Sequence, residues 1–192
     1  NTPPQVATPI ADFTVDEDAL DTELDLSSTF SDADIALSGE ALVLTITDNT
    51  NAGLVTATLV GTTLTLDYLA DQHGTATITL RATDSVGQWV EDTFTVTVDP
   101  VNDTPTVETP IADVTVDEDA DDSELDLSAT FGDVDIATNA DELALTVTGN
   151  TNSGLVTATL VGTTLTLDYP PNQHGTATIT LRATDSVGQW VE

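Results

Sequence analysis

The sequence predicts an all-β protein made of two similar β-sandwich domains. Apolar residues alternate with polar ones along many short stretches, and threonine is a frequent polar partner, with 38 copies in 192 residues. Glycine, asparagine and aspartate separate these stretches at short intervals. A β-branched polar residue that faces solvent and an aliphatic residue that faces inward are typical of half-buried antiparallel strands. Helical periodicity is nearly absent, so we expect strands throughout.

The two domains follow from an internal repeat with an offset of 101 residues. Residues 1–91 align with residues 102–192 without a gap, and 69 of the 91 pairs are identical. We therefore expect domain 1 to span 1–101 and domain 2 to span 102–192. The second repeat has no counterpart of residues 92–100 and should lack its last strand. Two explanations are open: the sequence is cut from a longer array, or another chain supplies the strand.

Seven strands are expected in the first repeat, because turn residues separate seven alternating stretches. These stretches cover residues 10–15, 24–29, 42–47, 54–60, 62–67, 75–83 and 89–98. Seven short strands in a domain of about 100 residues are typical of an immunoglobulin-like β-sandwich. Since successive strands run in opposite directions, the loops between them fall alternately at the two ends of the sandwich.

Composition excludes several classes of function. The chain carries 34 acidic and 2 basic residues, a formal charge of −32, so it should repel nucleic acid and anionic membranes. No apolar run is long enough for a spanning helix, and we expect no membrane insertion. The absence of cysteine excludes disulfides and thiolate catalysis. With two histidines and no Gly-x-Ser-x-Gly motif, we expect no catalytic residues and no enzyme.

The alternation of loops places acidic side chains at the ends of the domains. Where the two domains meet, we expect six carboxylates and one amide to converge as metal ligands: Glu17, Asp67, Asn102, Asp103, Asp133, Asp135 and Asp185, with Asp99 as a further candidate ligand. Carboxylates this close repel by roughly 1 kcal/mol per pair even in water. Because Ca²⁺ takes six to eight oxygen ligands, the expected cofactor is Ca²⁺. A partial metal site is expected at the other end of domain 1, from Asp32, Asp34 and Asp84.

Five short motifs lie in the acidic loops and the linker: Val15-Asp-Glu-Asp18, Leu66-Asp67, Val101-Asn-Asp-Thr-Pro105, Asp133-Val-Asp135 and Ala183-Thr-Asp185. They resemble motifs of cadherin-like repeats, especially the bacterial dystroglycan-type cadherin-like modules found in tandem in large secreted proteins and adhesins. The resemblance spans both repeats. It implies that these positions bind Ca²⁺ between successive domains, as the loop argument also predicts.

The sequence also departs from the family pattern. Leu69 and Pro170 replace a glutamate of the family, and Thr104 replaces an asparagine of the linker. Asp99 lies three residues before Asn102, where the family has two. The resemblance therefore implies fewer ions than animal cadherins bind. Domain 1 has Thr2 at the position of Asp103, which weakens its partial site.

These expectations combine into one function and one alternative. The first is a calcium-rigidified spacer or adhesion segment, secreted or on a bacterial cell surface, whose partners are neighbouring repeats of the same protein. The alternative is a module that binds polysaccharide or another cell-surface protein through the outer face of the sandwich.

Two tryptophans bear on the alternative function. Trp89 should lie on the outer face, opposite Arg81 on the neighbouring strand, and Trp190 and Arg182 repeat the pair. The rings could stack on sugars, or each arginine could fix the position of its tryptophan ring through a cation–π contact. We favour the cation–π contact.

Overall fold

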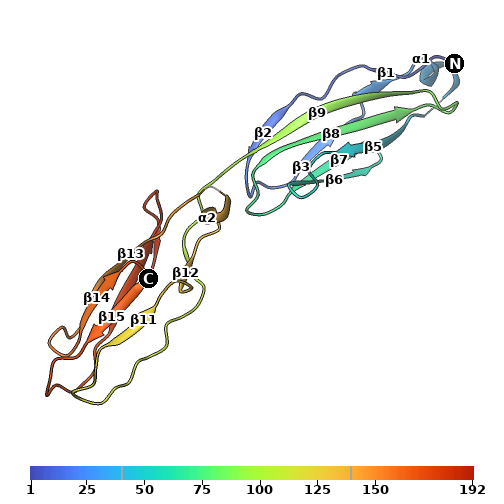
Figure 1. Ribbon diagram of the computed structural model, residues 1–192. Coiled ribbons are helices and arrows are strands. Elements are labelled where there is room, and N and C mark those ends of the chain that lie inside the picture. Colours follow the sequence, from blue (N-terminus) through green and yellow to red (C-terminus); the bar gives the residue numbers. More distant parts are fainter. Residues whose placement is uncertain (40, 139) are drawn as a thin grey trace. The chain divides into compact units, whose positions relative to one another are not determined.

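The computed structural model describes residues 1–39, 41–138 and 140–192 (Figure 1). The structure is nearly all β and confirms the predicted fold class. The chain divides into two compact units, Asn1–Val101 (unit 1) and Asn102–Glu192 (unit 2). Among the described residues, no helix combines the length and the apolar character needed to cross a membrane.

Unit 1 contains two main sheets and one short strand pair. The first sheet has the order β2 (Phe13–Asp16), β9 (Trp89–Asp99), β8 (Gly74–Thr83) and β5 (Val43–Asn49). The second sheet has the order β3 (Thr22–Asp25), β7 (Thr63–Tyr68) and β6 (Val55–Val60). The short pair is β1 (Gln5–Val6) with β4 (Phe30–Ser31). Only β2 and β9 run parallel; the other described pairs of unit 1 are antiparallel.

The central strand β9 connects the first sheet to the core of unit 1. Phe94, Val96 and Val98 point inward and are at most 1% exposed, and they alternate with threonines that are more exposed. Each inward residue also faces an apolar neighbour across the sheet, as Phe94 faces Ile78 of β8. This alternation is the half-buried pattern predicted for residues 89–98.

Unit 1 has nine described strands where seven were predicted, because the short pair β1 and β4 was not expected, and two further local features also differ from the prediction. The predicted strand 24–29 ends at Asp25, because the side chain of Asp25 accepts a hydrogen bond from the Ser27 N–H at 2.9 Å and turns the chain. A short helix, α1 (Ala33–Ser38), follows β4 and was not expected. Asp32 caps its N-terminus by accepting from the Asp34 N–H, and Gly39 ends it with a φ of 71°.

Unit 2 repeats this arrangement except at one edge. Its strand groups are β11 (Ser123–Asp126), β15 (Thr164–Asp168) and β14 (Thr157–Val161); β13 (Ala144–Asn150), β16 (Ile179–Thr184) and β17 (Trp190–Val191); and β10 (Thr106–Val107) with β12 (Phe131–Gly132). A short helix, α2 (Asp135–Thr138), corresponds to α1. Within the described residues of unit 2, 111–117 lie outside any strand, although their counterparts in unit 1 include β2.

Candidate metal centre

Three aspartates of unit 2 form an acidic cluster: Asp133, Asp141 and Asp185. Asp133 lies just before α2, Asp141 in the loop after it, and Asp185 directly after β16. One carboxylate oxygen of each lies within 4.8 Å of the others. Two oxygens that bind the same Ca²⁺ at 2.3–2.6 Å can be at most about 5 Å apart, so this spacing fits a single ion.

Backbone N–H groups hold one oxygen of each carboxylate in place. Asp133 Oδ1 accepts from the Asp135 N–H at 3.0 Å. Asp185 Oδ1 accepts from the N–H groups of Val187 and Gln189 at 3.0 and 2.7 Å. The turn that leads into α2 and the turn that follows β16 therefore orient these two side chains toward the cluster.

Asp141 is fixed in the same way, from two different segments. Its Oδ1 accepts from the Glu142 N–H at 2.8 Å and from the Ser186 N–H at 3.1 Å. Its own N–H donates to the Asp135 carbonyl at 3.2 Å, so the loop closes back on α2. Ala140 has a φ of 57°, and this left-handed conformation turns the chain so that Asp141 lies inside the loop.

The second oxygens of two of these aspartates have no hydrogen-bond partner in the described part of the chain. Asp133 Oδ2 and Asp141 Oδ2 are buried and have no hydrogen bond from any described residue. The whole side chain of Asp141 is only 9% exposed. A buried carboxylate oxygen without a donor costs free energy unless a cation compensates it. Carboxylate oxygens are the donors that hard cations prefer, so this cluster has donors that could hold such an ion.

The electrostatics of the cluster follow from burial and like charge. Burial raises the pKa of Asp133; a hydrogen bond from the Asp135 N–H opposes this rise, and the charges of Asp135, Asp141 and Asp185 add to it. A hydrogen bond from Ser186 lowers the pKa of Asp141, although burial opposes that shift. Asp141 therefore stays ionised beside other carboxylates, which leaves the cluster with an excess of negative charge.

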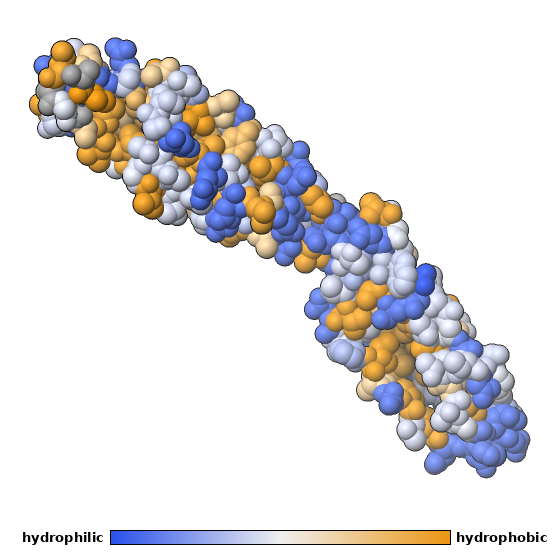
Figure 2. Space-filling model, turned by 180° about the vertical axis from the view of Figure 1, so that it is seen from behind, coloured by the Kyte–Doolittle hydropathy of each residue, from blue (hydrophilic) through white to orange (hydrophobic). Residues whose placement is uncertain are grey.

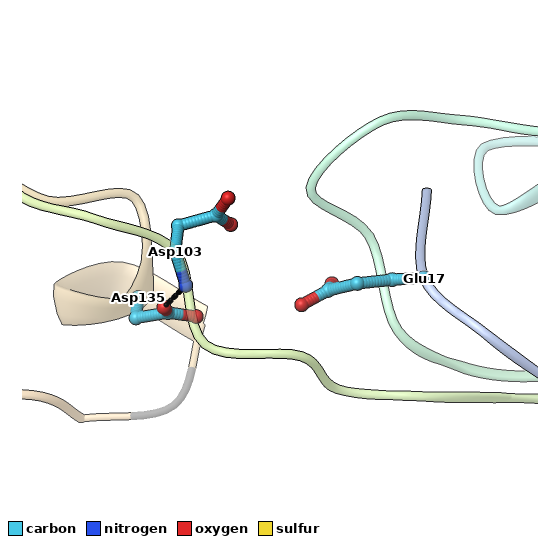
Figure 3. Close-up of side chains that lie close together, drawn as sticks. All are labelled: Glu17, Asp103 and Asp135. Atoms are coloured by element: carbon cyan, nitrogen blue, oxygen red, sulfur yellow. Dashed lines mark hydrogen bonds between the residues drawn. The ribbon is translucent and has the colours of Figure 1, made fainter. Parts of the chain in front are cut away.

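The first residues of unit 2 lie against this cluster. Asn102 Nδ2 donates to Asp185 Oδ2 at 2.9 Å. The Asp103 N–H donates to Asp135 Oδ2 at 2.7 Å, the contact drawn as a dashed line in Figure 3. Asp135 is 2% exposed. Unit 2 thus brings together five of the predicted ligands: Asn102, Asp103, Asp133, Asp135 and Asp185.

The three remaining predicted ligands belong to unit 1. Glu17, also drawn in Figure 3, is 5% exposed and accepts from the Val101 N–H at 2.7 Å. Its own N–H donates to the Asp99 carbonyl at 2.8 Å, so Glu17 and Asp99 are neighbours within the unit. Asp67 is exposed and accepts from the Thr56 hydroxyl at 3.3 Å. Their role as ligands stays a prediction.

The predicted partial site of unit 1 has the same construction. Asp32 Oδ1 accepts from the Asp34 N–H at 2.8 Å, and Asp84 Oδ1 accepts from two N–H groups of the turn that follows it. The other oxygens of Asp32 and Asp84 are buried without a partner among the described residues. Thr2 donates its N–H and its hydroxyl to Asp34 at 2.7 and 2.9 Å. Because Thr2 stands where unit 2 has Asp103, this site carries one carboxylate fewer.

Asp141 is the ligand candidate that sequence reasoning missed. Its counterpart in the first repeat is Glu40, which lies outside the described residues. An acidic residue at the same position of both repeats is a signal that could have identified it. The signal is weak on its own, because the surrounding residues 137–141 match residues 36–40 at only one position.

The two tryptophans have an arginine on one ring face. The Arg81 guanidinium carbon lies 4.3 Å from the centre of the Trp89 ring, and the equivalent distance between Arg182 and Trp190 is 4.0 Å. Arg81 Nε and Nη2 also donate to Glu91 at 3.0 and 2.8 Å. The arginines therefore hold the rings as cation–π partners, with the charge balanced by a glutamate. The sugar-stacking role of these rings stays a prediction.

Comparisons with known proteins find structural but no sequence matches. No family model matches the chain, and no curated protein matches it. Among solved structures, the EC1-4 fragment of PcdhgB3 is 15% identical with a TM-score of 0.54, and the match covers 98% of this chain and 47% of that one. The human desmocollin-1 ectodomain is 20% identical with a TM-score of 0.45, over 98% of this chain and 35% of that one.

An enzyme is also among the matches. The endo-fucoidan hydrolase MfFcnA4 from glycoside hydrolase family 107 is 18% identical with a TM-score of 0.39, over 98% of this chain and 27% of that one. The chain thus spans less than half of each of these three structures. The desmocollin and hydrolase matches have TM-scores below 0.5. The match to PcdhgB3 shows that this chain has a cadherin-like fold.

Proposed function

We propose that the chain is a calcium-binding segment of an extracellular protein, secreted or displayed on a bacterial cell surface, where it acts as a spacer or adhesion repeat. The observation that carries this proposal is the pair of buried oxygens of Asp133 and Asp141, which have no partner among the described residues and lie beside Asp185. A cation that binds these oxygens would offset both their burial and their mutual repulsion.

The chemistry of the donors favours calcium over other cations. All charged donors are carboxylates, and the cluster has no histidine or cysteine, which transition metals prefer. Mg²⁺ keeps several of its waters and requires near-octahedral geometry, whereas Ca²⁺ accepts irregular sets of protein oxygens. Extracellular calcium modules bind with a Kd of about 10⁻⁴–10⁻³ M, which suits a calcium-rich exterior.

The ligands predicted from the sequence in unit 1 belong to the same proposal. Glu17, Asp67 and Asp99 would add oxygens, and calcium would then restrict the linker at residues 100–105. X-ray scattering of the chain with calcium and with chelator measures this stiffening. The same scattering profile under both conditions would contradict the stiffening of the linker. Calcium binding to the Asp133–Asp141–Asp185 cluster is tested separately, by calorimetric titration.

Calorimetric titration tests the metal site itself. Asp141→Asn keeps the Oδ1 that accepts the Glu142 and Ser186 N–H groups but removes the charge. We expect this variant to bind Ca²⁺ at least about tenfold more weakly, because ligand charge sets affinity in oxygen sites. Asp133→Asn should act in the same direction.

The matched control is Asp126→Asn. Asp126 also accepts a backbone N–H, from Ser128 at 2.9 Å, but belongs to no acidic cluster found among the described residues. Its calcium affinity should equal that of the unchanged chain. Equal affinity for Asp141→Asn and Asp126→Asn would refute the proposed site.

A second candidate function is polysaccharide binding by the outer face. It is favoured by the exposure of the two tryptophans, 53% for Trp89 and 49% for Trp190, although an arginine lies on one face of each ring. Pull-down on insoluble polysaccharides in calcium-replete buffer tests it, with Trp89→Ala and Trp190→Ala combined as the control. Retention that survives the double substitution would show that the rings are not the binding platform.

A further inference from the structure

The first and last strands of the larger sheet of unit 1 run in the same direction. β2 and β9 pair in parallel through four residue pairs, from Phe13 opposite Val96 to Asp16 opposite Asp99. In Figure 1 the chain enters unit 1 at the end marked N and leaves it from the far end of β9. A pull on the chain before β2 and a pull on the chain after β9 therefore act in opposite directions along one row of bonds.

Two carboxylates extend this connection before the start of β2. Asp92 Oδ2 accepts from the Ile10 N–H at 2.8 Å, and Asp12 Oδ1 accepts from the Thr95 N–H at 2.7 Å. Both bonds join the segment before β2 to β9. The connection between the two segments therefore begins at Ile10 and not at Phe13.

Glu17 extends the connection at the other end. Its N–H donates to the Asp99 carbonyl at 2.8 Å, and its Oε1 accepts from the Val101 N–H at 2.7 Å. Val101 is the last residue of unit 1, so a pull on the linker reaches these bonds at once. Between the two ends, the rings of Phe13 and Phe94 stack with their centres 6.1 Å apart and add an apolar contact.

The chain before Ile10 is held by a shorter set of bonds. β1 pairs with β4 through two residue pairs. The N–H groups of Ala7 and Thr8 donate to the Thr29 carbonyl at 2.8 and 3.2 Å. A pull from the side of Asn1 should detach this segment first and then act on residues 10–17.

The direction of the pull decides how strongly such bonds resist. Asp12 is exposed and Asp92 is half-buried, and Figure 2 shows hydrophilic residues among hydrophobic ones on unit 1, at the upper left. Each bond is weak by itself, because water competes for its donor and its acceptor. A pull that peels two strands apart breaks the bonds one at a time. A pull along the strands loads all of them together, so they must break together.

We propose that residues 10–17 and 92–101 form a shear clamp through which unit 1 carries tension applied along the chain. This adds a load-bearing function to the proposed role as a spacer or adhesion repeat, on which the inference rests. A spacer transmits tension only while it does not lengthen by unfolding. The parallel direction of β2 and β9 gives unit 1 this property for a pull through its two ends.

Single-molecule stretching of the 192-residue chain in chelator tests the clamp, with handles attached to the two ends. Unfolding of residues 10–101 should lengthen the chain by roughly 300 Å, at about 3.3–3.6 Å per residue. Thr14→Cys combined with Thr97→Cys identifies this event, because these two residues are opposite each other and the sequence has no cysteine of its own. Their disulfide should abolish most of the lengthening.

The matched control changes only the direction of the pull. Leu20, in the loop after β2, is 91% exposed, and Leu20→Cys provides a handle at that end of the strand. A pull between this handle and the C-terminus enters and leaves unit 1 at the same end and peels strand pairs apart. Because forced unfolding follows the unfolding rate, the force that unfolds unit 1 should be at least about twofold lower than in the end-to-end pull. Equal forces in the two directions would overturn the proposal.

Two double variants test the carboxylates of the clamp. Asp12→Ala with Asp92→Ala removes both acceptors and should lower the end-to-end unfolding force. Asp12→Asn with Asp92→Asn removes the same charges but keeps an oxygen acceptor at each position, so it should retain most of the force. An unchanged force in the alanine variant, or equal losses in the two variants, would overturn a clamp that begins at Ile10.

The same measurements separate this inference from the calcium proposal. Asp12 and Asp92 belong to no acidic cluster found among the described residues. Because the chain is stretched in chelator, the directional difference in force should appear without calcium. A failed calcium titration would leave that difference intact, and equal forces in the two directions would leave the titration result intact.

Discussion

At the scale of single residues, the same small turn recurs in both units. Asp25 and Asp126 each accept a hydrogen bond from the N–H two residues later, at 2.9 Å, and each ends a strand. The hydrogen bond from the Ser27 backbone, with one from its side chain, lowers the pKa of Asp25 from its ordinary value of 3.8, and Ser128 does the same for Asp126. The ionised carboxylate is therefore the form that stabilises the turn.

This turn predicts a pH-dependent effect of Asp25→Asn. A carboxyl whose pKa is lowered by folding contributes stability above its unfolded pKa of 3.8 and loses it as the pH falls through the folded value. Asp25→Asn should therefore lower the free energy of unfolding at pH 7, and the difference from the unchanged chain should shrink as the pH falls below 3.8. Urea unfolding at pH 7 and at pH values below 3.8 measures it. A difference of the same size throughout would contradict the electrostatic origin.

The clustering of several candidate ligands could be predicted from sequence at this scale, because the period of two fixes which loops share an end of the sandwich. Asn102, Asp133 and Asp185 come together as that argument predicted. Asp141 could not be found in this way. Its position depends on the positive φ of Ala140 and on hydrogen bonds from two separate segments, which no periodicity encodes.

At the scale of elements, identical sequence gives different structure in the two units. Thr14-Val15-Asp16 forms part of β2, whereas the same three residues at 115–117 form no strand. β2 pairs in parallel with β9, whereas no described strand runs beside residues 115–117. Of the predicted strand 10–15, the structure places residues 13–15 in β2, so strand propensity alone does not decide where pairing occurs.

The arginine pairs give a prediction at the same scale, because they join neighbouring strands. Arg81 of β8 contacts both Trp89 and Glu91 of β9, and the side chains of the ion pair are about one third exposed. Arg81→Ala should lower the free energy of unfolding of unit 1 by about 0.5–1.5 kcal/mol, since exposed ion pairs and cation–π contacts each contribute little. Denaturant unfolding followed by Trp89 fluorescence measures the loss, after Trp190 is replaced by phenylalanine.

The conservative variant separates charge from geometry in this pair. Arg81→Lys keeps the positive charge but cannot donate through two parallel N–H groups, so it should recover only part of the lost stability. Full recovery by lysine would mean that charge alone matters. No loss in the alanine variant would mean that the pair does not stabilise the strands.

At the scale of the whole molecule, the dominant property is charge. With 34 acidic and 2 basic residues, nearly every long-range electrostatic term is repulsive. Both arginines are engaged with glutamates of their own units, so they neutralise nothing at the acidic clusters. Repulsion between the carboxylates therefore destabilises the folded state, and the burial of the alternating apolar residues stabilises it.

Ionic strength should then stabilise the calcium-free chain. In chelator, raising NaCl from about 0.01 M to about 1 M shortens the screening distance from roughly 30 Å to roughly 3 Å. The melting temperature should rise, by about 2–8 °C for each kcal/mol of repulsion removed. Calorimetry measures the shift. A few millimolar CaCl₂ adds little ionic strength, so a rise in melting temperature in CaCl₂ that equals or exceeds the rise in NaCl would indicate specific binding. A melting temperature that does not change with NaCl would contradict the role of repulsion.

The position of the two arginines also determines how the chain can be digested. Proteases of the trypsin class cut only after lysine or arginine, and the sequence offers them two bonds, after Arg81 and after Arg182. Both bonds lie within strands, β8 and β16, and both side chains are engaged on a tryptophan. An extended backbone must leave its sheet to enter such a protease, so cleavage requires β8 or β16 to unfold first. The loops contain no lysine or arginine, so proteases of this class cannot cut them even where they are exposed.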